Sequence, residues 1–265
     1  MPHVIVNGAR LYYEEHGDGP QIVIFAHGLL WSGQMFAQQV AALQQRYRCI
    51  TFDWRGQGQS EVTQAGYDME SLYADTLALI DALGVKVYHF VGLSMGGFIG
   101  MRLAARRPDA VASLILLGTS ADPEPAANIP KYRMLNLVGR WLGFGLVVTQ
   151  VMQIMFGQKF LNDPMRAQLR QEWRRRMLAN DRIGVTQATT GVIARQSIAD
   201  QLHTIRAPTL ILVGDQDVAT PPAVARRIHA RIPQSQLAII PGAGHTSTVE
   251  EPEAVNAAIL AFLST

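Results

Sequence analysis

The sequence predicts an α/β protein: a mostly parallel sheet with helices on both faces and a helical insertion between two strands. Three observations support this fold class. Short apolar segments bounded by turn residues alternate with segments whose apolar residues recur at the helical period. The alternation is interrupted once, between about residues 120 and 201, where only helical patterns occur. One apolar segment runs into Gly92-Leu93-Ser94-Met95-Gly96, a G-x-S-x-G pattern followed by a helical one.

Length and composition suit one large globular domain. The chain has 265 residues, of which 48% are hydrophobic and 17% charged. A net charge of +2 gives no reason to expect nucleic acid or an anionic membrane surface as a partner, and no segment reads as a membrane span. The single cysteine, Cys49, leaves no internal disulfide and is expected in the core. Met1-Pro2-His3 lacks the features of a secretion leader, so we expect a cytoplasmic location.

The N-terminal part begins with a hairpin. Two apolar segments, 4–6 and 11–13, flank Asn7-Gly8, a dipeptide that favours a tight hairpin turn. After a turn at 17–20, apolar runs predict strands at 21–26, 48–52 and 87–91. Helical spacing predicts helices at 35–43 and 71–83, and a third that begins at Met95 and is stopped by Pro108.

The C-terminal part repeats the alternation. Strands are predicted at 111–117, 209–213 and 237–240, and helices at 222–232 and 252–263. Such strands form a parallel sheet that is buried on both faces and carries its site at the carboxyl ends of the strands. The helical segment, which includes a helix opened by Asp163-Pro164, leaves the sheet at that edge. We therefore expect residues 1–119 and 202–265 to form a core domain and residues 120–201 a cap over it.

Ser94 is the candidate nucleophile. A sharp strand-to-helix turn strains the backbone, and side chains at Gly92 and Gly96 would clash with neighbouring elements. The serine is thereby exposed above the carboxyl edge of the sheet, beside the free N–H groups of a new helix.

A serine hydroxyl needs an adjacent base. Of seven histidines, His245 stands in a glycine-rich loop directly after the last strand, whereas His27 ends a strand and is a candidate for a local structural role. The base needs a carboxylate partner. Asp215 and Asp217 both follow the strand 209–213, and from the residues alone either can serve, with Asp122 a more distant choice.

These landmarks resemble the α/β-hydrolase superfamily over nearly the whole chain. Five motifs along the chain carry the resemblance: His27-Gly28, Asp53-x-Arg55-Gly56-x-Gly58-x-Ser60, Gly92-Leu93-Ser94-Met95-Gly96-Gly97, Gly214-x-x-Asp217 and Gly242-x-Gly244-His245. It implies the triad Ser94, Asp217 and His245, in the chain order of that family. It favours Asp217 over Asp215, and it makes Asp53 and Arg55 structural. It also implies an oxyanion hole from the backbone N–H groups of Leu29 and Met95.

The resemblance implies hydrolysis of carboxylic esters, with lactones as a further substrate class. The apolar cap described below leads us to expect short to medium acyl or aryl groups. Serine in place of aspartate at the strand-to-helix turn argues against dehalogenases and epoxide hydrolases. A 3-oxoadipate enol-lactonase-like enzyme and a carbon–carbon bond hydrolase remain alternatives within the fold. An alternative of another class is a ligand receptor or signalling protein without turnover. The sequence shows no metal cluster and no nucleotide loop, so we expect no metal and no cofactor. Oligomeric state is left open.

The cap is expected to set substrate choice. An apolar band spans residues 135–156 and is too wide for a helix with one buried face. We expect part of it, including Trp141 and Phe144, to line an apolar pocket above Ser94, and the methionines at 152 and 155 to suit an adaptable wall. The alternative is that the whole band packs on the core domain.

Overall fold

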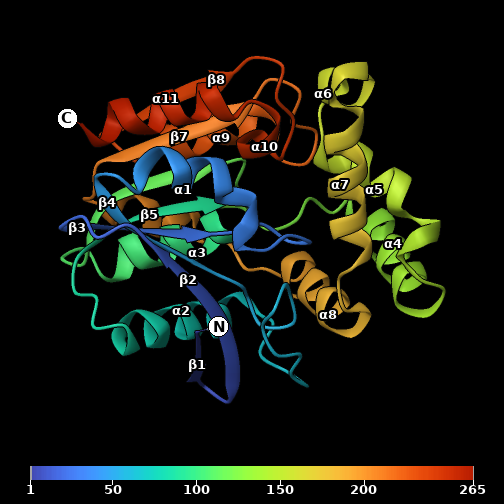
Figure 1. The fold of residues 1–265 in the computed structure, drawn as a ribbon, viewed down its shortest axis with the longest axis horizontal. Helices are drawn as coiled ribbons and strands as arrows, with labels where there is room; N and C mark the ends of the chain where they lie inside the picture. Colours follow the sequence, from blue (N-terminus) through green and yellow to red (C-terminus); the bar gives the residue numbers. More distant parts are fainter. Residues whose placement is uncertain (1, 265) are drawn as a thin grey trace.

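The computed structural model describes residues 2–264 and contains one eight-stranded sheet (Figure 1). The strand order is β1-β2-β4-β3-β5-β6-β7-β8; β1 and β2 pair antiparallel with their neighbours, and the remaining pairs are parallel. The mostly parallel sheet predicted from the sequence is confirmed. The strands are β1 (His3–Val6), β2 (Ala9–His16), β3 (Gln21–Ala26), β4 (Tyr47–Phe52), β5 (Tyr88–Leu93), β6 (Val111–Leu117), β7 (Thr209–Gly214) and β8 (Ser235–Ile240).

The central strands are continuous apolar runs because both faces of the sheet are covered. Phe25 and Val91 pack in one hydrophobic cluster with α1 and α11, whereas Ile24 and Phe90 pack in another with α2, α3 and α9. Figure 1 shows α1 and α11 on one side of the sheet and α2 and α3 on the other. The helices of this part are η1 (Gly33–Phe36), α1 (Ala37–Leu43), α2 (Met69–Ala82), α3 (Met95–Arg106), α9 (Pro222–His229), α10 (Ser247–Glu250) and α11 (Pro252–Leu263).

The predicted hairpin and core cysteine are present. Asn7 and Gly8 have φ of 46° and 73°, the left-handed values that a tight hairpin turn requires. Cys49 is fully buried within β4.

Every regular element between β6 and β7 is helical, as the sequence predicts. Figure 1 shows the main helices gathered at one end of the molecule, beside the sheet. Asp163 caps a short 3₁₀ turn through the N–H of Met165, and the long helix begins only afterwards. The elements are α4 (Ile129–Trp141), η2 (Phe144–Leu146), α5 (Val148–Met155), α6 (Gln158–Asn162), η3 (Pro164–Arg166), α7 (Ala167–Leu178), α8 (Arg182–Ile193) and η4 (Ala199–Thr204).

The helical segment returns to the point where it leaves the sheet. The N–H of Ile198 donates to the carbonyl of Ala121 at 2.9 Å, so the two connections to the sheet lie side by side. Arg195 forms a 2.7 Å ion pair with Glu124, and both side chains are more than nine-tenths buried. Arg195 Nε also donates to the carbonyl of Asp122 at 3.0 Å. These contacts close the segment on itself.

Candidate active site

Ser94 stands at a strained turn between β5, which ends at Leu93, and α3, which begins at Met95. Its φ is 52° and its ψ −110°, values that a non-glycine residue rarely adopts. The turn is held from both sides: the N–H of Ser94 donates to the carbonyl of Leu117 at 2.9 Å, and Thr119 Oγ1 donates to the carbonyl of Ser94 at 2.8 Å.

The two glycines of the pattern are required by close backbone approach. A Cβ at Gly92 would lie 2.4 Å from the carbonyl oxygen of Gly96, and a Cβ at Gly96 would lie 2.0 Å from that of Ala26. Any side chain at either position would therefore displace backbone, which explains the G-x-S-x-G spacing.

The predicted oxyanion donors belong to two backbone segments that flank Ser94. Met95 is the first residue of α3, so its N–H has no acceptor within the helix. The loop after β3 passes close by, because a Cβ at Gly28 would lie 3.4 Å from the Cβ of Ser94. Leu29 follows in this loop and lines the same cavity as Ser94. The N–H of Leu30, which has a φ of 74°, donates to Gln57 Oε1 at 2.8 Å and so anchors the loop.

His245 and Asp217 form a buried pair on the loops after β8 and β7. His245 Nδ1 lies 2.9 Å from Asp217 Oδ2, and both side chains are almost fully buried. Asp217 also accepts hydrogen bonds from the N–H groups of Ala219 and Thr220 and from the Thr220 hydroxyl. These four contacts fix the carboxylate, which leaves Nε2 as the ring nitrogen of His245 that faces away from it.

The other two candidate aspartates lie elsewhere. Asp215 Oδ1 accepts the N–H of Gly242 at 2.7 Å, an exposed contact that holds the loop before His245. Asp122 pairs at the surface with Arg227. The structure thus brings Asp217, and neither alternative, to His245.

One backbone segment links the serine to the histidine pair. Leu117, at the end of β6, accepts the N–H of Ser94. The next residue, Gly118, has a φ of 46°, and a Cβ there would lie 3.0 Å from Asp217 Oδ2 and 3.3 Å from His245 Nδ1. The absence of a side chain at Gly118 lets the acid–base pair approach the strand end that holds Ser94.

The environment of His245 favours the protonated ring overall. Burial alone would lower the pKa of His245, but the charge of Asp217 and its hydrogen bond outweigh burial and raise the pKa above its ordinary value. Asp217 thus stabilises the charged form of the ring, which a base needs once it has accepted a proton.

Glu250 is a buried carboxylate that sequence reasoning missed. Its Oε2 accepts the N–H of Gly157 at 2.7 Å and that of Gly244 at 2.9 Å, and its Oε1 accepts the N–H of Thr246 at 3.1 Å. It therefore ties the loop of His245 to the turn between α5 and α6. Burial raises the pKa of Glu250 to about 7, although the three N–H donors oppose that shift.

Ser94 and His245 line one cavity of about 130 Å³. The helical segment supplies most of its apolar wall: Leu135, Phe144, Val147, Val151, Ile154 and Met155. The expectation that the apolar band lines a pocket therefore applies to part of it. Met152 packs in the core instead, and Trp141 points to solvent with 72% of its surface exposed. Trp141 is consequently not a pocket residue, contrary to prediction.

Among the described residues that line the cavity, two side chains of opposite charge neutralise each other. Glu124 and Arg195 both line the cavity and bind each other at 2.7 Å. A charged substrate would have to break this pair or remain without a counter-ion.

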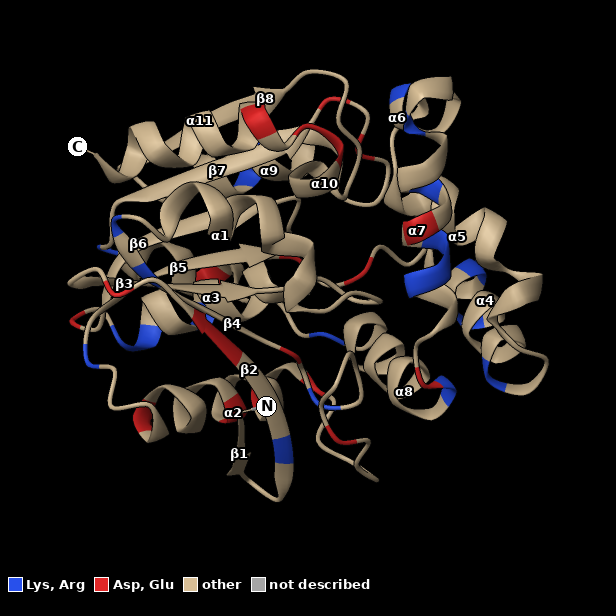
Figure 2. Ribbon diagram, viewed as in Figure 1, with Lys and Arg blue, Asp and Glu red and all other residues tan. Residues whose placement is uncertain are grey.

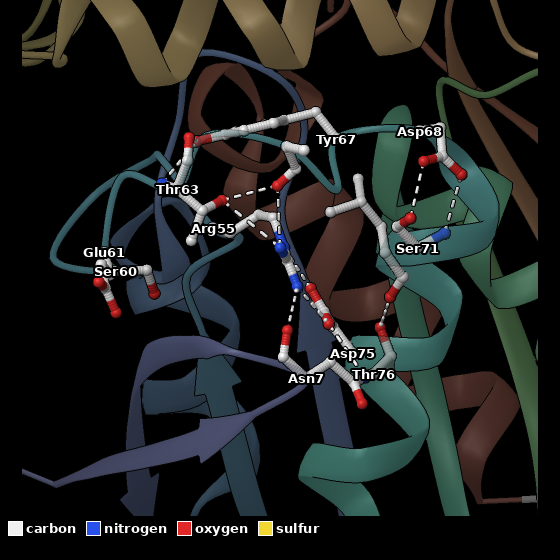
Figure 3. A network of polar contacts seen from close by, with 12 residues as sticks. Asn7, Arg55, Ser60, Glu61, Thr63, Tyr67, Asp68, Ser71, Asp75 and Thr76 are labelled. Atoms are coloured by element: carbon white, nitrogen blue, oxygen red, sulfur yellow. Dashed lines mark hydrogen bonds and ion pairs between the residues drawn. The ribbon is translucent and has the colours of Figure 1, made fainter.

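Asp53 and Arg55 have structural contacts, as the resemblance implies, and so does His27, whose position at the end of a strand suggested a local structural role. Arg55 binds Asp75 through two nitrogens at 2.6 Å each, and Figure 3 shows this pair at the centre of a network that reaches Asn7, Thr63 and Tyr67. Asp53 accepts the N–H groups of Gly33 and Gln59. His27 Nε2 accepts the N–H of Trp54 at 3.1 Å, and burial lowers the pKa of His27 to about 3.

Comparison with known proteins agrees with this geometry. A family model described as the alpha/beta hydrolase fold matches residues 21–252. The chain belongs to the α/β-hydrolase family. Among its relatives in this family is RutD of Caulobacter sp. strain K31, named as a carbamate hydrolase, which is 32% identical over 96% of both chains.

Two solved structures of α/β-hydrolases are similar over nearly all of their length. An enol-lactonase from Burkholderia xenovorans LB400 has a TM-score of 0.93 and 26% identity, and each chain is covered completely. A thermophilic esterase from Thermogutta terrifontis has a TM-score of 0.91 and 30% identity, with 100% of this chain and 98% of the other covered. The relatives thus share the fold and differ in the substrates for which they are named.

Proposed function

We propose that this α/β-hydrolase cleaves carboxylic esters with Ser94 as nucleophile, His245 as base and Asp217 as the acid that orients the base. The observation that carries the proposal is the buried His245–Asp217 pair, whose histidine lines the same cavity as a serine on a strained strand-to-helix turn. A serine, a histidine, a carboxylate and two backbone amides are sufficient for acyl transfer.

In this mechanism Ser94 Oγ attacks the ester carbonyl carbon while its proton passes to His245 Nε2. The N–H groups of Leu29 and Met95 stabilise the oxyanion. The bond to the alcohol oxygen then breaks, the alcohol leaves with the proton from His245, and the acyl group stays on Ser94. Water then repeats the sequence. Its oxygen attacks the acyl carbon while His245 takes its proton, the acyl–serine bond breaks, His245 returns the proton to Ser94 Oγ, and the acid is released.

The preferred substrate in this proposal is a small apolar ester. A cavity of about 150 Å³ accommodates a benzene ring, and the cavity above Ser94 is of similar size. Its apolar walls and its internally paired Glu124 and Arg195 favour short acyl or aryl groups over charged acids. In this scheme residues 120–201 act as the cap, and residues 1–119 with 202–265 supply the catalytic groups.

The decisive experiment labels and removes the nucleophile. Phenylmethylsulfonyl fluoride should leave one adduct, and mass spectrometry should find it on the peptide that contains Ser94. Ser94→Ala should lose roughly a million-fold in turnover of p-nitrophenyl acetate, by analogy with triad deletions in a serine protease. An adduct on another residue, or an alanine variant that keeps its activity, would refute the assignment.

Two further measurements separate the alternatives. A burst of one equivalent of p-nitrophenol without sustained turnover would favour a ligand receptor on this fold. A panel of aryl esters, alkyl esters, enol-lactones and carbamates compares the bond classes for which the relatives are named, and the ester proposal expects the highest kcat/KM on the short aryl and alkyl esters.

A further inference from the structure

An apolar surface is exposed on the helical segment, on the side away from the active-site cavity. It consists of Met134, Leu137, Trp141, Leu142 and Leu146, here called the α4–η2 face, and each of these side chains is more than half exposed. Soluble proteins rarely expose several large apolar side chains together unless the surface binds something.

The α4–η2 face consists of residues on one side of α4 and of two exposed leucines that follow the C-terminal end of this helix. Met134, Leu137 and Trp141 follow each other at spacings of three and four residues, which places them on one side of α4. Tyr132, Leu135 and Asn136 of the same helix line the cavity. Helix α4 therefore has two apolar sides, one directed to the substrate cavity and one to solvent, whereas an ordinary surface helix has one.

The charge around this face is positive. Residues 125–162 contain no aspartate or glutamate. Lys131 and Arg133 are exposed on α4, and Arg140 and Arg182 lie near its C-terminal end, since a Cβ at Gly143 would lie 3.7 Å from Arg182. Figure 2 shows basic segments along α4 and α7.

The net charge of +2 conceals this asymmetry. Residues 120–201 hold 11 of the basic and 6 of the acidic residues, whereas the rest of the chain holds 12 and 15. An electrostatic preference for anionic surfaces can therefore belong to one end of the molecule.

We propose that the α4–η2 face binds the surface of an anionic phospholipid bilayer. A helix with tryptophan and leucine on one side and lysine and arginine beside them is the composition that lies in the interface of a membrane. Tryptophan favours the level of the lipid headgroups, and the basic residues are attracted to anionic ones. Such binding needs no spanning segment, and among the described residues no helix has the length and hydropathy to cross a bilayer.

Charge disfavours a second copy of this chain as the occupant. A two-fold dimer brings the same surface of both subunits together. Lys131, Arg133 and Arg140 would then face their own equivalents around an apolar centre, and such like-charge contacts oppose association. An anionic lipid surface satisfies the apolar and the basic residues at once.

The experiment uses the full-length protein without any substrate, so its outcome does not depend on the proposed esterase activity. Vesicles of phosphatidylglycerol and phosphatidylcholine in equal parts are compared with vesicles of phosphatidylcholine alone in a flotation assay. The protein should float with the anionic vesicles only, and salt should release it as the Debye length falls from about 10 Å at 0.1 M to about 3 Å at 1 M. Trp141 is a built-in reporter, because Trp31, Trp54 and Trp173 are buried; its emission should shift to shorter wavelength on binding.

Matched variants identify the surface. Lys131→Glu/Arg133→Glu should lower the vesicle partition coefficient by about tenfold or more, and Leu137→Ser/Trp141→Ser should do the same without removing charge. Arg46→Glu/Arg226→Glu changes two exposed basic residues on the rest of the molecule by the same charge, and Ile5→Ser removes an exposed apolar side chain there. Both controls should bind as the wild type does, and unchanged melting temperatures would show that all variants are folded.

Three outcomes would overturn the proposal: no difference between the two kinds of vesicle, an equal loss in the control variants, or a dimer in lipid-free sedimentation that Leu137→Ser/Trp141→Ser dissociates. Turnover of soluble p-nitrophenyl acetate is measured separately in the same preparations. A wild-type protein that hydrolyses the ester but does not bind anionic vesicles would reject only the membrane proposal, and a wild-type protein that binds vesicles without turnover would reject only the esterase.

Discussion

At the scale of single residues, the site depends on backbone positions that a side chain normally avoids. Three non-glycine residues among those described have positive φ, namely Asn7, Leu30 and Ser94. Asn7 is in a hairpin turn where such a value is usual. Leu30 and Ser94 both line the cavity, and each is held by specific hydrogen bonds, to Gln57 for the first and to Leu117 and Thr119 for the second. The strain is therefore concentrated where the proposed oxyanion donors and nucleophile lie.

The choice between the two aspartates gives the first residue-scale prediction. Asp217→Asn should lower kcat by about ten-thousand-fold, because an amide in place of the carboxylate stabilises the wrong tautomer of His245. Asp215→Asn is the matched control: its partner is the N–H of Gly242, so it should cost far less. Steady-state kinetics of both variants on one aryl ester decide the matter, and a larger loss for Asp215→Asn would reverse the assignment.

The decrease of activity at acidic pH gives the second residue-scale prediction. Only neutral His245 can accept the serine proton, so kcat/KM should fall as pH decreases through the pKa of this residue. Asp217 raises that pKa, and the midpoint should therefore lie at or above about 6.5. Asp217→Asn should move the midpoint to lower pH. A rate that stays constant down to about pH 4 would exclude histidine as the base.

At the scale of elements, the prediction that residues 120–201 set substrate choice can be tested at one particular side chain. Phe144 lines the cavity and packs back against α4, where a Cβ at Gly139 would lie 2.8 Å from its ring. Phe144→Ala should change the ratio of kcat/KM between a short and a longer ester by about 1 to 3 kcal/mol, the scale of one hydrophobic pocket contact. Trp141→Ala is the matched control and should leave the ratio for soluble esters unchanged. Equal losses on every ester for Phe144→Ala, with a lower melting temperature, would indicate a structural role only.

The difference between Phe144 and Trp141 shows what sequence pattern can predict. Hydrophobic periodicity places the strands and the main helices of the rest of the chain, but within residues 120–201 it places only the helix that follows Asp163-Pro164. It cannot assign the sides of a helix whose two faces are both apolar, as in α4. The orientation here depends on Gly139 and on Gly143, whose φ of 101° turns the chain so that Phe144 folds inward.

The site residues divide in the same way. Ser94 and His245 can be nominated as candidates from the sequence because each follows a strand in a distinctive glycine-rich motif. Asp217 could be preferred over Asp215 only through resemblance to a family, since both follow β7. Glu250 has no motif: its role arises from the approach of Gly157, which is 93 residues away in the chain.

At the scale of the whole molecule, Glu250 makes stability depend on pH. A glutamate in an unfolded chain titrates near 4.3, and burial raises the pKa of Glu250 to about 7 in the native state. Between these values the native state holds a proton that the unfolded state has lost, so the free energy of unfolding should decrease as pH rises from about 4.5 to about 7.

Glu250→Gln cannot titrate and tests this directly. Urea unfolding of both proteins at pH 5 and pH 8 should show the wild type losing up to about 3 kcal/mol relative to the variant between the two pH values. The prediction compares how the free energy of unfolding of each protein changes with pH. The cost of placing an amide beside three N–H groups is the same at both pH values and therefore cancels. Glu253→Gln, on the exposed side of α11, should keep the slope of the wild type. Parallel slopes for the wild type and Glu250→Gln would contradict the prediction.

The hydrogen bond between Ile198 and Ala121 has a consequence for how such a protein diversifies. Because the two ends of the helical segment are hydrogen-bonded to each other, the segment joins the rest of the chain at two adjacent positions. Its replacement by a segment of another length leaves the spacing of β6 and β7 unchanged, and Ser94, Asp217 and His245 all lie outside it. A different segment can therefore change the pocket wall and the outer surface together while the three residues proposed to be catalytic are kept.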